Sequence, residues 1–343
     1  MIPLSAVEQA LSCNISPVLA EQALRLIQRS GSILLIGHAH PDPDAIGSAL
    51  GLAFALTEYG KSCYVLMPDE PDLGYAEFLP GFASIITELP DSTLDLIIAL
   101  DAGDATRYGD IFTKYSVQLM GIPIINIDHH ITSQGFGVVN IIDPQAAATA
   151  ELLTLFIQQL QLPMNKNAAQ CLLAGIITDT RSFEFDATTA RTLLAGSLLV
   201  SYGAVPQSIV KPMYRLHEFA SAQLLGLVLH TLRADCDGKL VWAEITMDMW
   251  GQAGLQPGSG DDGIPSYLVD VRGAQVAILF RQTDANSVRV SVRTTDTCDA
   301  TAITTLFGGG GHARAAGCVL LGDVRAEKEK LLAAAAAHIA AQV

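Results

Sequence analysis

The sequence predicts an α/β protein in which a doubly wound, mainly parallel sheet domain precedes a smaller α/β C-terminal domain, with a cleft between them. The first reason is that short apolar runs alternate with helical stretches over residues 1–205, as in a series of βαβ units. The second is that polar residues follow three of these runs, and parallel strands end at one edge of a sheet. The third is a change to paired strands beyond residue 230.

The first domain, residues 1–205, can be followed element by element. Residues 1–30 carry the apolar stripe of a helix. Four later runs have the length and apolar content of buried strands, and helices fill the intervals. We expect strands at 33–36, 63–67, 95–100 and 123–127, a loop rich in Pro, Asp and Glu at 68–80, and helices at 49–56, 149–160, 168–177 and 188–202.

A helical connector, residues 206–230, is expected to break at Pro206 and Pro212 and to lead into a second domain, residues 231–343. The second domain has a different pattern, with fewer helical stretches and a pair of neighbouring strands. We expect a helix at 218–232, a strand at 239–245, a glycine-rich loop at 251–263, strands at 274–280 and 287–292 around a turn at 283–286, and helices at 300–306 and from 323 onwards.

Composition narrows the class of function. Half of the 343 residues are hydrophobic, yet the apolar runs are shorter than the roughly 18 residues of a membrane span. Arg25 is the first basic residue, so no signal peptide is expected. The net charge of -15 argues against long nucleic acid as a partner, although it equally fits a solubilising surface. The scattered cysteines lack C-x-x-C spacing and indicate reduced thiols in a cytoplasmic protein. They are Cys13, Cys63, Cys171, Cys236, Cys298 and Cys318.

The stretch after the first strand supplies an imidazole and two carboxylates. His38, Asp42 and Asp44 form the pattern H-x-x-x-D-x-D between a strand and a helix. Such ligands suit a divalent metal ion, or two ions that share neighbouring carboxylates. The alternative is a polar loop in which Asp44 only caps the helix.

Two further strands end in residues of the same kind. Asp101 and Asp104 follow the third strand, and the run from Asp128 to His130 follows the fourth. Asp179 ends an apolar helix, where the helix dipole disfavours an anion, so that a cation should lie nearby unless the residue is an exposed turn. Any one of these residues could be a cap, but three strand ends together favour a metal site.

The second domain contains a different kind of motif. Gly308 to Gly311 form an unbroken glycine run, and His312 and Arg314 follow it. The amides of such a run can approach an anion closely, and Arg281 and Arg293 on the expected strands add cations. The alternative is that the glycines only turn the chain and that His312 is a buried structural residue. The run is not a dinucleotide fingerprint, because it follows a helix and lacks a βαβ context.

Taken together, these motifs resemble the DHH phosphoesterase family, named for the sequence that stands here at residues 128–130. The resemblance covers nearly the whole chain, because residues 309–312 and 315–317 are similar to the family's DHHA-type substrate domain. The two-domain pattern is most similar to bacterial oligoribonucleases that also dephosphorylate 3′-phosphoadenosine 5′-phosphate. The resemblance therefore implies a hydrolase of short oligonucleotides or of a nucleoside bisphosphate.

The resemblance also implies a role for each residue. Asp101 would bridge two divalent ions, and His130 would face the phosphate. Mixed imidazole and carboxylate ligation favours Mn²⁺, with Mg²⁺ or Co²⁺ as alternatives. The implied ligands are His38, Asp42 and Asp101 for one ion, and Asp44, Asp101, His129 and Asp179 for the second. The implied substrate-binding residues are Arg281, Arg293, Gly309, Gly310, Gly311 and His312.

Two residues depart from the family pattern. Arg181 stands where many members have glycine, and Glu184 occupies a position that is often basic. We expect both to affect substrate preference more than hydrolysis. The alternatives are a cyclic dinucleotide phosphodiesterase, an inorganic pyrophosphatase, an exonuclease of long DNA and a non-catalytic nucleotide sensor. No membrane partner is expected, and a homodimer is compatible with the sequence.

Overall fold

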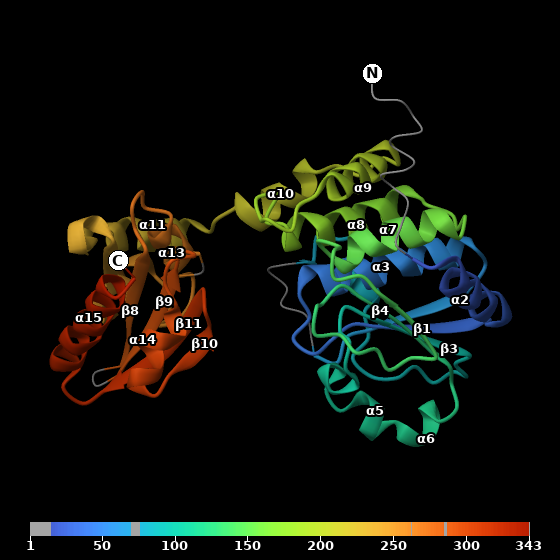
Figure 1. Ribbon diagram of the computed structural model, residues 1–343, viewed down its shortest axis with the longest axis horizontal. Helices are drawn as coiled ribbons and strands as arrows, with labels where there is room; N and C mark the ends of the chain where they lie inside the picture. The colour runs from blue at the N-terminus through green and yellow to red at the C-terminus, as the bar shows by residue number, and fades with distance from the viewer. Residues whose placement is uncertain (1–14, 70–75, 262, 285–286, 343) are drawn as a thin grey trace. The chain divides into compact units, whose positions relative to one another are not determined.

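The chain folds into two compact units, Met1–Leu216 and His217–Val343 (Figure 1). The computed structural model describes residues 15–69, 76–261, 263–284 and 287–342. Several expected features lie partly or wholly outside these residues. They are the first half of the 1–30 helix, Cys13, and parts of the 68–80 loop, the 251–263 loop and the 283–286 turn.

The first unit is built on a five-stranded parallel sheet with the order β2-β1-β3-β4-β5. The sheet confirms the four expected strands and the predicted fold class, and it adds a fifth strand that the sequence pattern did not predict. The strands are β1 (Ser32–Ile36), β2 (Ser62–Leu66), β3 (Leu96–Leu100), β4 (Ile124–Asp128) and β5 (Val139–Ile142).

Both faces of this sheet are covered, which explains why its strands are continuous apolar runs rather than alternating ones. Ile33 and Leu35 of β1 join one core, whereas Leu34 and Ile36 join a second core on the opposite face. Figure 1 shows α3, α7 and α8 over one face and α5 and α6 beyond the other. The helices are α2 (Pro17–Arg29), α3 (Pro43–Glu58), η1 (Phe82–Ser84), η2 (Ala105–Tyr108), α5 (Ile111–Lys114), α6 (Ser116–Leu119), α7 (Thr149–Gln159), α8 (Lys166–Asp179), α9 (Ala190–Ser201) and α10 (Gln207–Tyr214).

Close packing of α3 against α8 depends on glycine. A Cβ atom at Gly47 would lie 2.4 Å from the carbonyl oxygen of Cys171, so the two helix backbones are almost in contact. At Gly175 a Cβ atom would lie 2.3 Å from Oδ1 of Asp44. The two glycines therefore bring the beginning of α3 close to the end of α8, which ends at Asp179.

Two expectations for the first unit need correction. Helix α3 begins at Pro43, six residues before the expected start, so Asp44 lies in its first turn rather than in a loop. Proline suits this position, because the first helical N–H has no partner within the helix. The predicted break at Pro212 is wrong, because α10 continues through Pro212 and ends at Tyr214.

The second unit contains a six-stranded sheet with the order β10-β11-β9-β8-β7-β6. All its pairs are antiparallel except β7 with β8. Helices α14 and α15 cover one face, and α11, α12 and α13 pack on the other. The elements are α11 (Phe219–His230), β6 (Arg233–Asp235), η3 (Cys236–Gly238), β7 (Leu240–Ile245), α12 (Met247–Ala253), α13 (Ile264–Val269), β8 (Val276–Asp284), β9 (Ser287–Thr294), α14 (Ala300–Thr304), η4 (Thr305–Phe307), β10 (Gly310–His312), β11 (Ala315–Leu321) and α15 (Val324–Ala340).

The glycine run is partly a strand, which the sequence did not predict. Gly310 pairs with Gly317 and His312 with Ala315, so the end of the run forms the edge strand β10. The expected loop at 251–263 also begins inside α12. No helix among the described residues combines the length and apolarity that a bilayer crossing requires, and the five cysteines described are free.

Candidate metal centre

His38 leaves the carboxyl end of β1 with its imidazole almost fully buried. Nδ1 donates to the carbonyl oxygen of Ala39 at 2.8 Å, which directs the other ring nitrogen into the site. Nε2 lies 3.5 Å from Oδ2 of Asp101 and 3.8 Å from Oδ2 of Asp42. Burial opposes protonation of this ring, but its hydrogen bonds to the two carboxylates raise the pKa of His38 to about 10.

Asp42 is the N-cap of α3 and uses only one oxygen for this purpose. Oδ1 accepts from the amides of Asp44 and Ala45, both at 3.0 Å, while Oδ2 faces His38. The alternative in which Asp44 merely caps the helix is therefore wrong, because the cap is two residues earlier. One oxygen of Asp42 thus remains available for a ligand.

Asp44 is fully buried and is held by the first turn of another helix. The amide of Thr149 donates to Oδ2 at 2.7 Å and the amide of Ala150 to Oδ1 at 3.1 Å. The amides at the N-terminus of α7 favour a negative charge at this position. Even so, burial and the charges of Asp101 and Asp179 raise the pKa of Asp44 well above its usual value.

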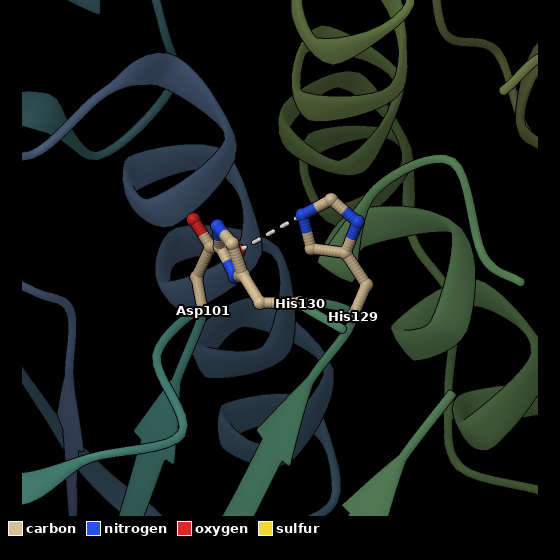
Figure 2. A group of neighbouring side chains, drawn as sticks. All are labelled: Asp101, His129 and His130. Atoms are coloured by element: carbon tan, nitrogen blue, oxygen red, sulfur yellow. Dashed lines mark ion pairs between the residues drawn. The ribbon is translucent and has the colours of Figure 1, made fainter. Parts of the chain in front are cut away.

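Asp101 lies at the centre of the group, immediately after β3, with a left-handed backbone (φ 63°) (Figure 2). This conformation is costly for a residue other than glycine and is held by its surroundings. The buried hydroxyl of Tyr108 donates to the carbonyl oxygens of Leu100 and Ala102 on either side. The hydroxyl of Thr149 donates to Oδ1 of Asp101 at 2.7 Å, so both the backbone and the carboxylate are fixed.

His129 reaches the same point from the end of β4. Its Nδ1 lies 3.2 Å from the carbonyl oxygen of Ala146, so Nε2 faces the carboxylates. Nε2 is 3.2 Å from Oδ2 of Asp179 and 3.6 Å from Oδ1 of Asp101. Burial, together with the charges of Asp101 and Asp42, raises the pKa of Asp179 to about 8.

His130 is oriented differently from its neighbour. Its Nδ1 donates to Oδ1 of the fully buried Asp128 at 2.7 Å, and its ring centroid lies 4.6 Å from that of His129. The bond to Asp128 raises the pKa of His130. Figure 2 shows both rings beside Asp101, and Nδ1 of His130 is 3.9 Å from its Oδ1. Asp128 was noted in the sequence as a strand-end residue but not as the partner that orients His130.

The donor set fits divalent cations. Three groups of side chains place one ligand atom each within 4.8 Å of one another. Within the described part of the chain, these carboxylates form ion pairs only with histidines. No described lysine or arginine therefore neutralises their negative charge by an ion pair. The raised pKa values of Asp44 and Asp179 and the inward-facing imidazole nitrogens are what an oxygen- and nitrogen-ligated metal would stabilise. The groups are His38, Asp42 and Asp101; Asp44, His129 and Asp179; and Asp101, His129 and His130.

The structure thus brings all six predicted metal ligands together around Asp101, together with His130. Asp104 does not join them, because its Oδ1 accepts from the amide of Thr106 and caps η2. Thr149 and Tyr108 support the centre and were missed. Nothing in the sequence indicated that the hydroxyl of Thr149 contacts Asp101, because the two residues are 48 positions apart.

The departures from the family pattern lie beside Asp179. Arg181, Ser182 and Phe183 all have left-handed backbones, with φ values of 47°, 61° and 69°. Glycine adopts this conformation without strain, which would explain the glycine that the family resemblance leads us to expect at position 181. Nε of Arg181 lies 3.4 Å from Oε2 of Glu184.

The predicted substrate-binding residues lie in the second unit and differ in how they are held. Arg281 on β8 forms an ion pair with Asp261 and donates to the hydroxyl of Ser291. Arg293 on β9 has no ion pair with any described carboxylate, and burial together with the charge of Arg281 lowers its pKa. Arg314, part of the basic patch expected from the sequence, uses its guanidinium on the carbonyl oxygens of 295, 296 and 298.

The glycines of the run differ in the steric constraints that their backbones meet. A Cβ atom at Gly309 would lie 2.2 Å from the carbonyl oxygen of Gly317, and Gly311 has φ 143°. At Gly310 a Cβ atom would meet nothing within 4 Å. His312 is exposed, so the alternative of a buried structural histidine is wrong.

Known proteins are similar to this chain over both units. The model of the DHH family, N-terminal domain, matches residues 32–176, and that of the DHHA1 domain matches residues 262–341. A protein of Thermus thermophilus, named bifunctional oligoribonuclease and PAP phosphatase, is 33% identical over 325 residues, or 92% of each chain. The chain belongs to the DHH family. It is accordingly a hydrolase of the phosphoesterase type.

Two other proteins extend the comparison. A cyclic-di-AMP phosphodiesterase of Listeria monocytogenes is 26% identical over 93% of this chain and 49% of its own length. The crystal structure of an exopolyphosphatase-related protein from Bacteroides fragilis has a TM-score of 0.77 and 23% identity, covering 93% of this chain and 96% of the other. The second comparison shows a shared fold. Together with the family match, it confirms the resemblance inferred from the motifs.

Proposed function

We propose that this DHH-family hydrolase uses two divalent metal ions to hydrolyse short oligonucleotides, including linear dinucleotides, and 3′-phosphoadenosine 5′-phosphate. The observation that carries the proposal is the convergence of carboxylates and imidazoles on Asp101 from three strand ends and one helix end. The Thermus relative, named for oligoribonuclease and PAP phosphatase activity, supports the choice of substrates.

The residues divide into two ligand sets that share Asp101. When bound, the two ions supply a nucleophile derived from water at neutral pH and neutralise charge on the phosphoryl oxygens. The donor set is best suited to Mn²⁺, with Mg²⁺ or Co²⁺ as alternatives. The first set is His38, Asp42 and Asp101, and the second is Asp44, Asp101, His129 and Asp179.

His130 acts on the substrate in this proposal. Asp128 accepts a hydrogen bond from Nδ1–H, which fixes the ring and favours the doubly protonated imidazole. Nε2 is then a donor and stabilises negative charge on a phosphoryl oxygen, or gives its proton to the leaving oxygen. Because the side chain is 44% exposed, the ring is accessible to a ligand.

The second unit offers groups suited to bind a nucleotide or its phosphate. Arg293 is a cation available for this purpose, because it has no ion pair with a described carboxylate, whereas Asp261 already neutralises Arg281. His312 is exposed at the end of β10, and the space above Gly310 is open to a ligand.

A substrate panel tests the proposal. Metal-depleted protein is supplied with Mn²⁺ and assayed on short RNA, linear di-adenylate, 3′-phosphoadenosine 5′-phosphate, cyclic di-AMP and pyrophosphate. We expect turnover of the first three, and loss of that turnover with a chelator. Equal rates with and without the chelator would overturn the metal dependence, and turnover of pyrophosphate alone would overturn the substrate class.

Cyclic di-AMP is the second candidate substrate, because the Listeria relative named for its hydrolysis matches 93% of this chain. That relative is about twice as long as the matched region, since the match covers only 49% of it. We therefore place the linear substrates first. A kcat/KM for cyclic di-AMP above that for linear di-adenylate would reverse the order.

A further inference from the structure

A buried ion network lies next to the segment that contacts the candidate metal ligands. Arg191 of α9 donates through Nε to Oε1 of Glu151 at 2.5 Å and through Nη1 to Oδ2 of Asp143 at 2.7 Å. The exposed fractions of the three side chains are 13%, 0% and 8%, respectively. The network therefore joins α9, α7 and the segment after β5 inside the first unit.

The second oxygen of Glu151 is also bonded. Oε2 accepts from the hydroxyl of Thr192 at 2.7 Å and from the amide of Ala147 at 3.1 Å. Burying ions costs free energy, and well-packed apolar residues often stabilise a protein as much as a buried ion pair does. The interest of this network therefore lies in the chain segment that it fixes rather than in its contribution to stability.

The turn at residues 146–149 lies between this network and the candidate ligands. The carbonyl oxygen of Ala146 accepts from Nδ1 of His129, which sets the direction of the ring. The amide of Thr149 donates to Asp44, and its hydroxyl donates to Asp101. Three ligands of the proposed centre are thus oriented by one turn of four residues.

We propose that Arg191, Glu151 and Asp143 form a positioning brace that sets the metal affinity of the centre by fixing this turn. The inference rests on the proposed metal site. None of the three residues belongs to the groups of possible metal ligands, so they act through the turn, whose Ala147 amide Glu151 holds. In metal sites, residues that orient the ligands typically change affinity by about 10- to 100-fold when they are removed.

The test compares Glu151→Gln and Arg191→Lys with a matched control on α9. Glu151→Gln keeps the shape but removes the charge, and Arg191→Lys keeps the charge but loses the forked donors that reach two carboxylates. Leu199→Ala, a fully buried residue of the same helix, disturbs packing without touching the network. For each protein, Mn²⁺ affinity is measured by isothermal titration calorimetry well below its melting temperature, and the melting temperature is measured without metal.

We expect Glu151→Gln and Arg191→Lys to weaken Mn²⁺ binding about 10-fold or more. Leu199→Ala should lower the melting temperature and keep the wild-type Mn²⁺ affinity. The brace is refuted if the two network variants bind Mn²⁺ like the wild type, or if Leu199→Ala weakens binding as much as they do. If the wild type itself does not bind Mn²⁺, the proposed function fails rather than the brace.

Discussion

Asp42 has two tasks, one for each carboxylate oxygen, and two substitutions can separate them. Oδ1 caps α3 by accepting from two amides, and Oδ2 faces His38 in the metal cluster. Asparagine retains an oxygen for the cap but loses the charge, whereas alanine loses both. Asp42→Asn and Asp42→Ala should therefore agree in metal binding and differ in stability.

The size of the difference follows from the cap. Asparagine and aspartate are equivalent at this position, and replacement by alanine costs about 1 kcal/mol, with a range of roughly 0.5–2 kcal/mol. In metal-free protein, Asp42→Ala should thus be less stable than Asp42→Asn by about 1 kcal/mol, or roughly 2–4 °C in melting temperature for a unit of this size. Both variants should bind Mn²⁺ more than about 10-fold more weakly than the wild type, because a ligand contributes at least as much as a supporting residue.

Urea denaturation in the presence of a chelator measures the stability difference, and calorimetric titration measures the Mn²⁺ affinity. Equal unfolding free energies for the two variants would show that Oδ1 of Asp42 does not stabilise α3. Wild-type Mn²⁺ affinity in Asp42→Asn would show that Oδ2 of Asp42 is not a ligand. The cap by Oδ1 and the metal ligation by Oδ2 are therefore tested independently.

Three further predictions concern other parts of the site. His129→Ala should lose bound metal, whereas His130→Ala should keep it and lose turnover; an equal loss of metal, by elemental analysis, would contradict this division of roles. Gly309→Ala should destabilise the fold by roughly 1–3 kcal/mol through overpacking, whereas Gly310→Ala should unfold like the wild type and raise KM for the dinucleotide; equal melting temperatures would contradict this contrast. Tyr108→Phe should remove the hydroxyl donor from the carbonyl oxygens of Leu100 and Ala102, of which Ala102 keeps the side-chain amide of Asn126, and cost about 0.5–1.5 kcal/mol in urea denaturation; an unchanged midpoint would contradict it.

The sequence predicted the meeting of the candidate ligands because most of them follow apolar runs of strand length. His38, Asp101 and His129 are far apart along the chain, yet parallel strands place their carboxyl ends at one sheet edge. Asp179 could be suspected from its place at the end of an apolar helix. Its approach to His129 depends on the close packing of α3 and α8, which periodicity does not reveal.

The parts that were not predicted depend on contacts between distant segments. The amide of Thr149 meets Asp44 across 105 residues, and Arg191 meets Asp143 across 48. Hydrogen bonds of this kind follow from how helices pack and leave no local pattern. The strand β10 was missed for another reason: glycine has a low strand propensity, and the close approach of β11 that requires glycine at 309 and 311 leaves no local pattern.

The central claim is that the side chains around Asp101 hold two divalent metal ions. Anomalous diffraction at the manganese absorption edge, from a crystal soaked in Mn²⁺, tests it most directly. We expect two anomalous peaks, one beside His38 and Asp42 and one beside His129 and Asp179, with Asp101 in contact with both. A well-ordered crystal with no peak within coordination distance of Asp101 would contradict the account.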